Sequence, residues 1–158
     1  MYKNKRSPDS LHLIPVMQKI CFEQDFYGWT QQQAQFLKNR QLDHIDWTQI
    51  AEEIEDMGRS EKRQLASRLE VLIMHLLKWQ FQPNLRSRSW QLTLKEQRLR
   101  LAKLLQENPS LQPCLAEAIL SAYPLAVISA ERETGLSHYP DSCPYSPEEL
   151  LNQQFLPD

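Results

Sequence analysis

Apolar residues recur at intervals of three and four along most of this chain, and no segment shows the strict alternation of a half-buried strand. Glycine, which turn-rich β architectures use often, occurs only three times among 158 residues. The periodic segments also begin and end at residues that are typical of helix caps. The sequence therefore predicts an all-α fold, a compact bundle of five or six helices.

The most strongly marked pair of helices lies near the middle of the chain. Asp46 is a favourable N-cap for the first, and Gly58 is typical of the residue that follows a helix end. Ser60 is then suited to cap a second helix that runs to about Gln80. The short connection between them predicts that the two helices are spatial neighbours, and a hairpin is the simplest arrangement.

Each of these two helices has an apolar stripe that we expect to be buried. The stripe of the first helix consists of Trp47, Ile50, Ala51, Ile54 and Met57. The stripe of the second helix consists of Leu65, Leu69, Leu72, Ile73, Leu76 and Leu77. The second stripe is broad, which is typical of a central helix in a bundle, and Leu72 at its middle is expected to be fully buried.

The chain before this pair is less regular. Residues 1–24 are polar at their start and are predicted to form a tail with at most a short docking helix. The first clear helix is expected to begin at Thr30, whose spacing to Gln33 matches a capping box, with its glutamines at the surface. Residues 25–158 are then predicted to form a single helical-bundle domain.

Two longer helices and an irregular tail are predicted after the central pair. The fourth helix is expected to begin at Ser87 or Ser89 and to run to Glu107. The fifth is expected to run from Ser110 to about Glu133, with Gly135 as its end signal. Pro124 lies within the fifth helix and should kink it, because proline lacks a backbone donor and clashes with the preceding turn. The irregular C-terminal tail contains one short helix that Ser146 is suited to cap.

Charge and cysteine content limit the classes of partner. With 18 Lys plus Arg and 20 Asp plus Glu, the net charge of -2 gives no overall attraction for nucleic acid or an acidic membrane. Three widely spaced cysteines without a Cys-x-x-Cys pair suit reduced thiols. We find no export signal and no run near the roughly 18 apolar residues of a membrane span. We therefore expect a cytoplasmic protein with no cofactor, whose partner is another protein.

One histidine lies within a strong helical pattern, and it is the first candidate for chemistry. His75 follows Arg68 by seven residues and Glu61 by fourteen, on one flank of the same helix. The Arg–His spacing is similar to the signature of HEPN-type ribonucleases, in which the histidine titrates near neutral pH and the arginine steadies phosphate charge. The simpler interpretation is a structural histidine, more than half buried and bonded to a polar group of another helix.

A pair of carboxylates is the second candidate. Glu53 and Asp56 are three residues apart, so they are neighbours on the helix surface. Together with His75 they are the candidate ligands of a divalent cation, as in the metal sites of helical bundles. A solvated acidic face is the simpler interpretation, and we expect no bound metal.

Arg98 differs from the other basic residues of its helix because it falls at the edge of the apolar face. A bidentate salt bridge to a carboxylate of another helix is its natural role. The candidate partners are Glu53, Asp56 and Glu133. Arg98 and Glu133 are therefore predicted to be structural polar residues.

Several motifs, in chain order, resemble one family. They are Asp25-Phe-Tyr-Gly-Trp29, Ala51-Glu-Glu-Ile-Glu-Asp-Met-Gly-Arg-Ser60, His75-Leu-Leu-Lys-Trp-Gln-Phe-Gln-Pro83, Arg86-Ser-Arg-Ser-Trp90, Glu96-Gln-Arg98, Glu133-Thr-Gly-Leu136 and Cys143-Pro-Tyr145. Over about residues 25 to 157 the chain resembles domain-of-unknown-function family number twenty-nine, small bacterial proteins abundant in cyanobacteria. The resemblance implies a small helical bundle of bacterial origin and supplies no catalytic residues. Gly28 departs from the alanine expected at that position.

These observations lead to one favoured hypothesis and two alternatives. Because no complete catalytic constellation is present, we favour a non-catalytic interaction or accessory module. The alternatives are a toxin-type, metal-independent ribonuclease that uses Arg68 and His75, and a metal-dependent hydrolase that uses Glu53, Asp56 and His75. The ribonuclease should cut RNA in EDTA, the hydrolase should lose its activity with a chelator, and the module should show neither behaviour.

Overall fold

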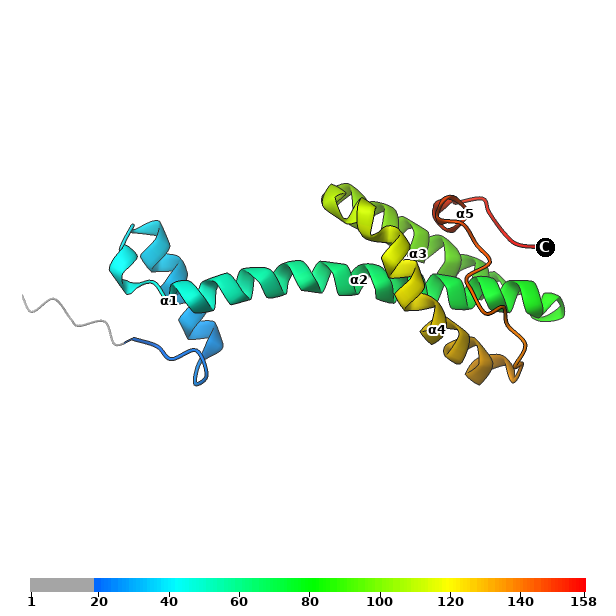
Figure 1. Cartoon of the computed structure of the whole chain (residues 1–158), viewed down its shortest axis with the longest axis horizontal. Helices are drawn as coiled ribbons and strands as arrows, with labels where there is room; N and C mark the ends of the chain where they lie inside the picture. The colour runs from blue at the N-terminus through cyan, green and yellow to red at the C-terminus, as the bar shows by residue number, and fades with distance from the viewer. Residues whose placement is uncertain (1–18) are drawn as a thin grey trace, which may run out of the picture. The chain divides into compact units, whose positions relative to one another are not determined.

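The computed structural model describes residues 19–158, and all regular secondary structure in that range is helical (Figure 1). The α-helices are α1 (Phe26–Lys38), α2 (Trp47–Phe81), α3 (Arg88–Glu107), α4 (Leu115–Thr134) and α5 (Pro147–Leu151). Short 3-10 helices occur at Leu42–His44, Pro83–Leu85 and Pro109–Cys114. The all-α prediction is confirmed.

The chain divides into two compact units, unit 1 (Met1–Ile50) and unit 2 (Ala51–Asp158). The predicted N-terminal tail lies largely outside the described range. Residues 19–25 contain a turn and no helix.

In unit 1, α1 begins four residues earlier than the sequence predicts. The side chain of Asp25 caps the helix by accepting a hydrogen bond of 2.8 Å from the backbone N–H of Gly28. Thr30 is already inside the helix, where its hydroxyl donates to the carbonyl of Tyr27. A Cβ atom on Gly28 would lie 2.3 Å from Oδ2 of Asp25, so glycine at this position gives the capping carboxylate the room it needs.

Two glutamines of α1 are buried, contrary to the expectation that they lie at the surface. The apolar core of unit 1 consists of Trp29, Phe36 and Ile45. Beside it, the side-chain carbonyl of Gln33 accepts from the backbone N–H of Asp46 at 2.9 Å, and that of Gln32 accepts from Ile20 at 2.9 Å. A backbone N–H group removed from water needs an acceptor, and these glutamines supply it.

The largest departure from the sequence prediction is that α2 is one helix of 35 residues where two were expected. Gly58 lies inside the helix, and a Cβ atom there would meet nothing within 4 Å. A glycine in a helix interior costs only about 0.5–1 kcal/mol relative to alanine, so it weakens a helix without ending it. Ser60 is consequently no N-cap, and the predicted hairpin does not form.

The two predicted apolar stripes of α2 differ in burial. All six residues of the second stripe are completely buried. In the first stripe, Trp47, Ile54 and Met57 are 57%, 63% and 69% exposed. The prediction that the first stripe is buried is therefore wrong for these three residues.

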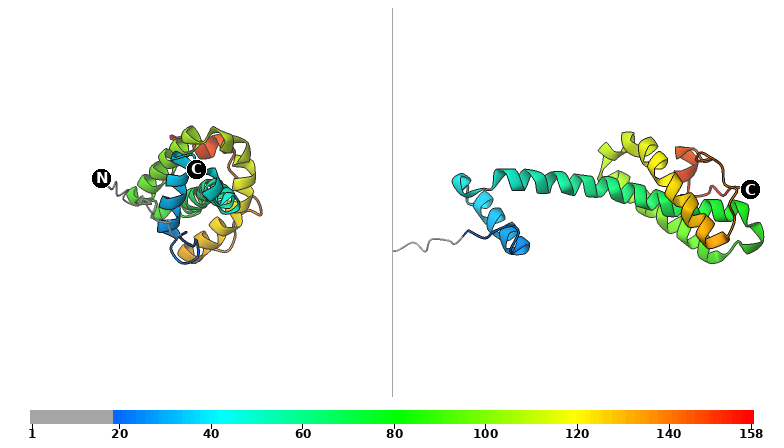
Figure 2. Two further views of the ribbon diagram at one scale, coloured as in Figure 1. Left: turned by 90° about the vertical axis from the view of Figure 1, so that its left-hand side faces the viewer. Right: turned by 60° about the horizontal axis from the view of Figure 1, so that its bottom comes forward.

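The core of unit 2 forms where α3 and α4 pack against the second half of α2 (Figures 1 and 2). Leu72 is completely buried there, as predicted. The caps of this unit also agree with the sequence: the side chain of Ser87 accepts from the N–H of Trp90, Ser146 makes a capping box with Glu149, and Gly135 ends α4. Gly135 has the positive φ of 72° that favours glycine.

The helix that contains Pro124 is confirmed, and its start differs from the prediction. The segment begins with the 3-10 helix Pro109–Cys114, and α4 then continues through Pro124 to Thr134. By length and composition alone, the segment Pro109–Thr134 is apolar enough to cross a membrane, because an 18-residue window within it has a mean hydropathy of 1.5. This differs from the expectation that no such segment exists. The inner face of α4 belongs to the core of unit 2, as is typical of a core helix.

Candidate functional site

The residues proposed as metal ligands are not brought together. Asp56 and His75 lie in one continuous helix, and 19 residues of helical rise separate them by about 28 Å. Asp56 instead pairs with Arg59, which also contacts Glu55, and all three are exposed. Within residues 19–158 no group of three or more His, Cys, Asp or Glu side chains is placed to hold a metal ion. The single helix thus removes the geometric basis of the hydrolase alternative.

Arg68 and His75 also point to different places. The guanidinium of Arg68 donates twice to the side-chain carbonyl of Gln64, at 3.2 and 2.8 Å, and so extends toward the start of α2. It lines a cavity of about 230 Å³ together with Glu61 and residues of α3, and His75 is not among the lining residues. The structure therefore groups Arg68 with Glu61 and leaves the histidine apart.

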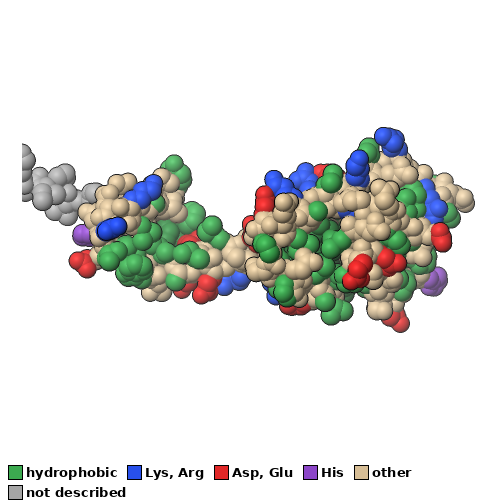
Figure 3. Space-filling view, turned by 90° about the horizontal axis from the view of Figure 1, so that it is seen from above, with side chains coloured by type: hydrophobic (Ala, Val, Ile, Leu, Met, Phe, Trp, Pro, Cys, Tyr) green, Lys and Arg blue, Asp and Glu red, His purple; other side chains and the backbone are tan. Residues whose placement is uncertain are grey.

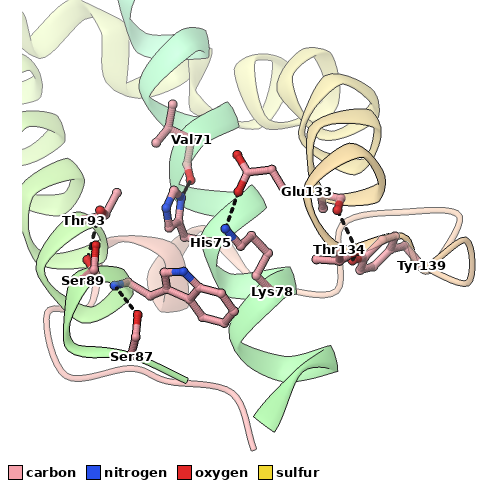
Figure 4. Close-up of polar contacts among 11 residues, drawn as sticks. Val71, His75, Lys78, Ser87, Ser89, Thr93, Glu133, Thr134 and Tyr139 are labelled. Carbon is pink, nitrogen blue, oxygen red and sulfur yellow. Dashed lines mark hydrogen bonds and ion pairs between the residues drawn. The ribbon is translucent and has the colours of Figure 1, made fainter. Parts of the chain in front are cut away.

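His75 lies in a polar cluster at the junction of α2, α3 and α4 (Figure 4). Its ring is half-buried, and Nδ1 makes a hydrogen bond of 2.8 Å to the carbonyl of Val71, one turn earlier in the same helix. Because a carbonyl only accepts, Nδ1 carries the proton, and the lone pair of the neutral ring is on Nε2. Among the described residues, the predicted bond of His75 to another helix is not formed.

Two opposing sets of influences act on the pKa of His75. Burial lowers it most; the hydrogen bond to Val71 raises it, the positive charge of Lys78 lowers it, and the negative charge of Glu133 raises it. The net effect is a pKa below the ordinary value of histidine, so the ring is neutral at neutral pH.

Lys78 is the centre of this cluster, and the sequence interpretation overlooked it. The side chain is buried, its ammonium pairs with Glu133 of α4, and it lies 4.5 Å from the ring centroid of Trp90 on α3. One lysine thus connects three helices by an ion pair and a cation–π contact (Figure 4). The only sequence signal was a lone lysine within the apolar run from Leu72 to Phe81.

Arg98 is only 2% exposed, yet it forms no salt bridge within residues 19–158. Its Nε donates to the carbonyl of Leu150 at 3.0 Å, and Nη2 donates to the carbonyl of Glu149 at 3.4 Å. The expected pairing with a carboxylate is wrong, because the guanidinium is directed to these two carbonyls near the end of α5. The side chain of Glu149 is directed to the backbone N–H of Ser146. Burial lowers the pKa of Arg98.

Three buried or half-buried groups that could act as nucleophiles have raised pKa values, which favour their protonated forms. Burial raises the pKa of the Cys143 thiol, and it raises the pKa of the Tyr123 hydroxyl to about 12. The hydroxyl of Tyr145 also has a raised pKa, chiefly through burial, and it donates to the side chain of Gln80 at 2.8 Å. These groups support packing and are not activated for catalysis.

Comparison with known proteins identifies the family of this chain. The sequence matches the family described as "Domain of unknown function DUF29" over residues 21–156. Comparisons with curated proteins and with solved structures gave no match. Because the family match extends over nearly all of its 158 residues, this chain belongs to the DUF29 family.

Proposed function

We propose that the protein is a non-catalytic interaction module, in which the exposed start of α2 in unit 2 binds a basic amphipathic helix of a protein partner. The observation that carries this proposal is an uncovered apolar stripe. Ile54 and Met57 lie on the helix face that, four turns later, contains Leu69 and Leu72 of the core. An apolar helix face of this kind is suited to pack against another helix.

The charge around this stripe indicates the chemistry of the partner. Residues 51–59 contain four carboxylates and one arginine, so their net charge is -3. The ion pairs of Arg59 with Asp56 and Glu55 are exposed and contribute little. A helix with Lys or Arg beside its apolar face complements this surface, whereas a second copy of the acidic stripe repels it.

The polar cluster of unit 2 supports a non-catalytic role. Lys78 and Glu133 neutralise each other, and His75 bonds to its own helix. On the face of the molecule in Figure 3, side chains of both charge signs are mixed with apolar ones, and no broad basic surface for nucleic acid is visible. We also propose a cytoplasmic location, because three free cysteines suit a reducing compartment.

A model peptide tests the proposed surface. We expect a fluorescently labelled amphipathic peptide of leucine and lysine, about 18 residues long, to bind the full chain, and its leucine–glutamate twin not to bind. Ile54→Ser should weaken binding about tenfold by removing a central apolar contact. Leu120→Ser is the matched control, because Leu120 on α4 is another apolar residue that is more than half exposed.

Three outcomes would contradict the proposal. Equal binding by wild type and Ile54→Ser would show that the peptide binds elsewhere. A stable dimer in light scattering that Ile54→Ser dissociates would assign the stripe to a second copy of the chain. RNA cleavage in EDTA that a folded His75→Ala variant lacks would restore the ribonuclease alternative.

A further inference from the structure

A cavity of about 300 Å³ lies between α3 and the C-terminal segment of unit 2. Its floor includes Arg98 and Leu94 of α3, and its outer wall is formed by Gln153, Gln154 and Leu156. This volume is at the lower end of the range for small-molecule sites. The cavity is separate from the polar cluster around His75 and from the start of α2.

Arg98 is the buried charge of this cavity, and its hydrogen-bonding capacity is largely unused. A guanidinium has five N–H donors, of which the carbonyls of Leu150 and Glu149 accept two. Within residues 19–158 no carboxylate pairs with the charge, and no nitrogen of Arg98 is among the buried atoms without a partner, so the N–H groups that make no hydrogen bond are accessible from the cavity. A buried charge is unfavourable unless an opposite charge or sufficient hydrogen bonds compensate it.

The remaining polar groups around the cavity favour an anion. Lys95 lies one turn before Arg98 on α3 and adds a second positive charge at the rim. Three glutamine side chains contribute amide donors, and no Asp or Glu lines the cavity. Leu94 and Leu156 supply a small apolar wall. The cavity thus combines a buried guanidinium, an exposed ammonium and neutral donors.

We infer that this cavity binds the oxyanion group of a small organic acid, a carboxylate or a phosphate, with Arg98 as the principal ligand and Lys95 at the rim. A planar guanidinium suits two parallel hydrogen bonds to either group. The apolar wall favours a ligand that has a short hydrocarbon part beside its anionic group. This site goes beyond the proposed helix-binding surface, and each can fail without the other.

Titration of the full-length protein with sodium acetate, sodium butyrate and inorganic phosphate tests the inference. The chloride concentration is adjusted to keep the ionic strength constant, and the backbone and glutamine side-chain NMR signals are followed. We expect saturable shifts in the millimolar range, confined to residues 91–98 and 153–156. Tighter binding of butyrate than acetate would identify a carboxylate ligand, and tighter binding of phosphate would identify a phosphate ligand.

Variants separate a site from a general charge effect. Lys95→Gln, at an exposed position that leaves the core intact, should weaken binding about threefold, and Arg98→Lys should weaken it at least about tenfold. Arg100→Gln is the matched control, because Arg100 pairs with Glu96 outside the cavity and its loss should not change the affinity. If no anion gives saturable shifts, or if Lys95→Gln and Arg100→Gln have equal effects, the inference is wrong.

Discussion

Two stretches of α2 within unit 2 have the same apolar spacing and opposite surroundings. In residues 51–58 the apolar side chains point into solvent, whereas in residues 65–77 the equivalent positions form the centre of the core. Both stretches belong to one uninterrupted helix, so neither differs in backbone geometry. The comparison shows that apolar periodicity predicts which face of a helix is apolar and leaves undetermined what covers it.

The difference also explains how a helix passes through Gly58. Once part of a helix is fixed, each further residue adds a hydrogen bond at little extra entropic cost. The buried second half of α2 provides that fixed part, so the first half is extended from an existing helix. Glycine and serine at positions 58 and 60 are then tolerated in its interior.

The largest expected difference in the free energy of unfolding is between substitutions of one leucine in the covered half of α2 and one isoleucine in the exposed half. Leu72→Ala should lower the free energy of unfolding by about 2–5 kcal/mol, because it removes buried methyl groups and leaves a cavity. Ile54→Ala should change it by less than about 0.5 kcal/mol, since Ile54 is exposed in the isolated chain. Urea unfolding followed by circular dichroism measures both, and similar losses would mean that the start of α2 is covered.

Substitution of two glycines by alanine should give the next largest changes in the free energy of unfolding. Gly135→Ala should destabilise the protein by about 1–2 kcal/mol, because alanine is strained at its positive φ. Gly58→Ala should have the opposite sign and stabilise the helix by about 0.5–1 kcal/mol, since the added methyl group meets nothing. The same unfolding experiment applies, and a destabilising Gly58→Ala would indicate a helix end at that residue.

Two serines test the same difference between a helix end and a helix interior, with smaller expected changes in the free energy of unfolding. Ser87→Ala should cost about 1 kcal/mol, because Ser87 accepts a hydrogen bond from the first turn of α3. Ser60→Ala should be neutral or slightly stabilising, by up to about 0.5 kcal/mol, because Ser60 lies within a helix. Amide hydrogen exchange of the following turn provides a local measure. Loss of protection after Ser60→Ala would restore the predicted second N-cap.

The smallest expected effect is a pH dependence in the covered half. The pKa of His75 is lower in the folded state than in the unfolded chain, so the unfolded chain binds the proton more tightly. The free energy of unfolding should therefore be constant at high pH and decrease as pH falls below about 6.5. His75→Asn should reduce this decrease. Parallel pH profiles of wild type and variant between about pH 8 and 5 would show that burial of His75 has no energetic consequence.

The candidate site could be predicted from the sequence only in part. The helical pattern indicated that His75 is partly buried, but its bond to Val71 and the distance of Arg68 depend on side-chain direction. Lys78 was missed because a lysine in an apolar run normally extends to the surface. For Arg98, the sequence predicted a structural role, and the acceptors proved to be backbone carbonyls of α5.

The sequence by itself determined the features that depend on a few neighbouring residues. The α-helical class, the N-caps at Ser87 and Ser146, and the left-handed end of α4 at Gly135 follow from periodicity and from hydrogen bonds over three or four residues. Only the tertiary structure decided that Gly58 lies within a helix, that Ile54 and Met57 are exposed, and that Arg98 is buried with backbone carbonyls as its acceptors. These properties depend on which distant segments pack together, and the energy of that packing exceeds the local preference of any single residue.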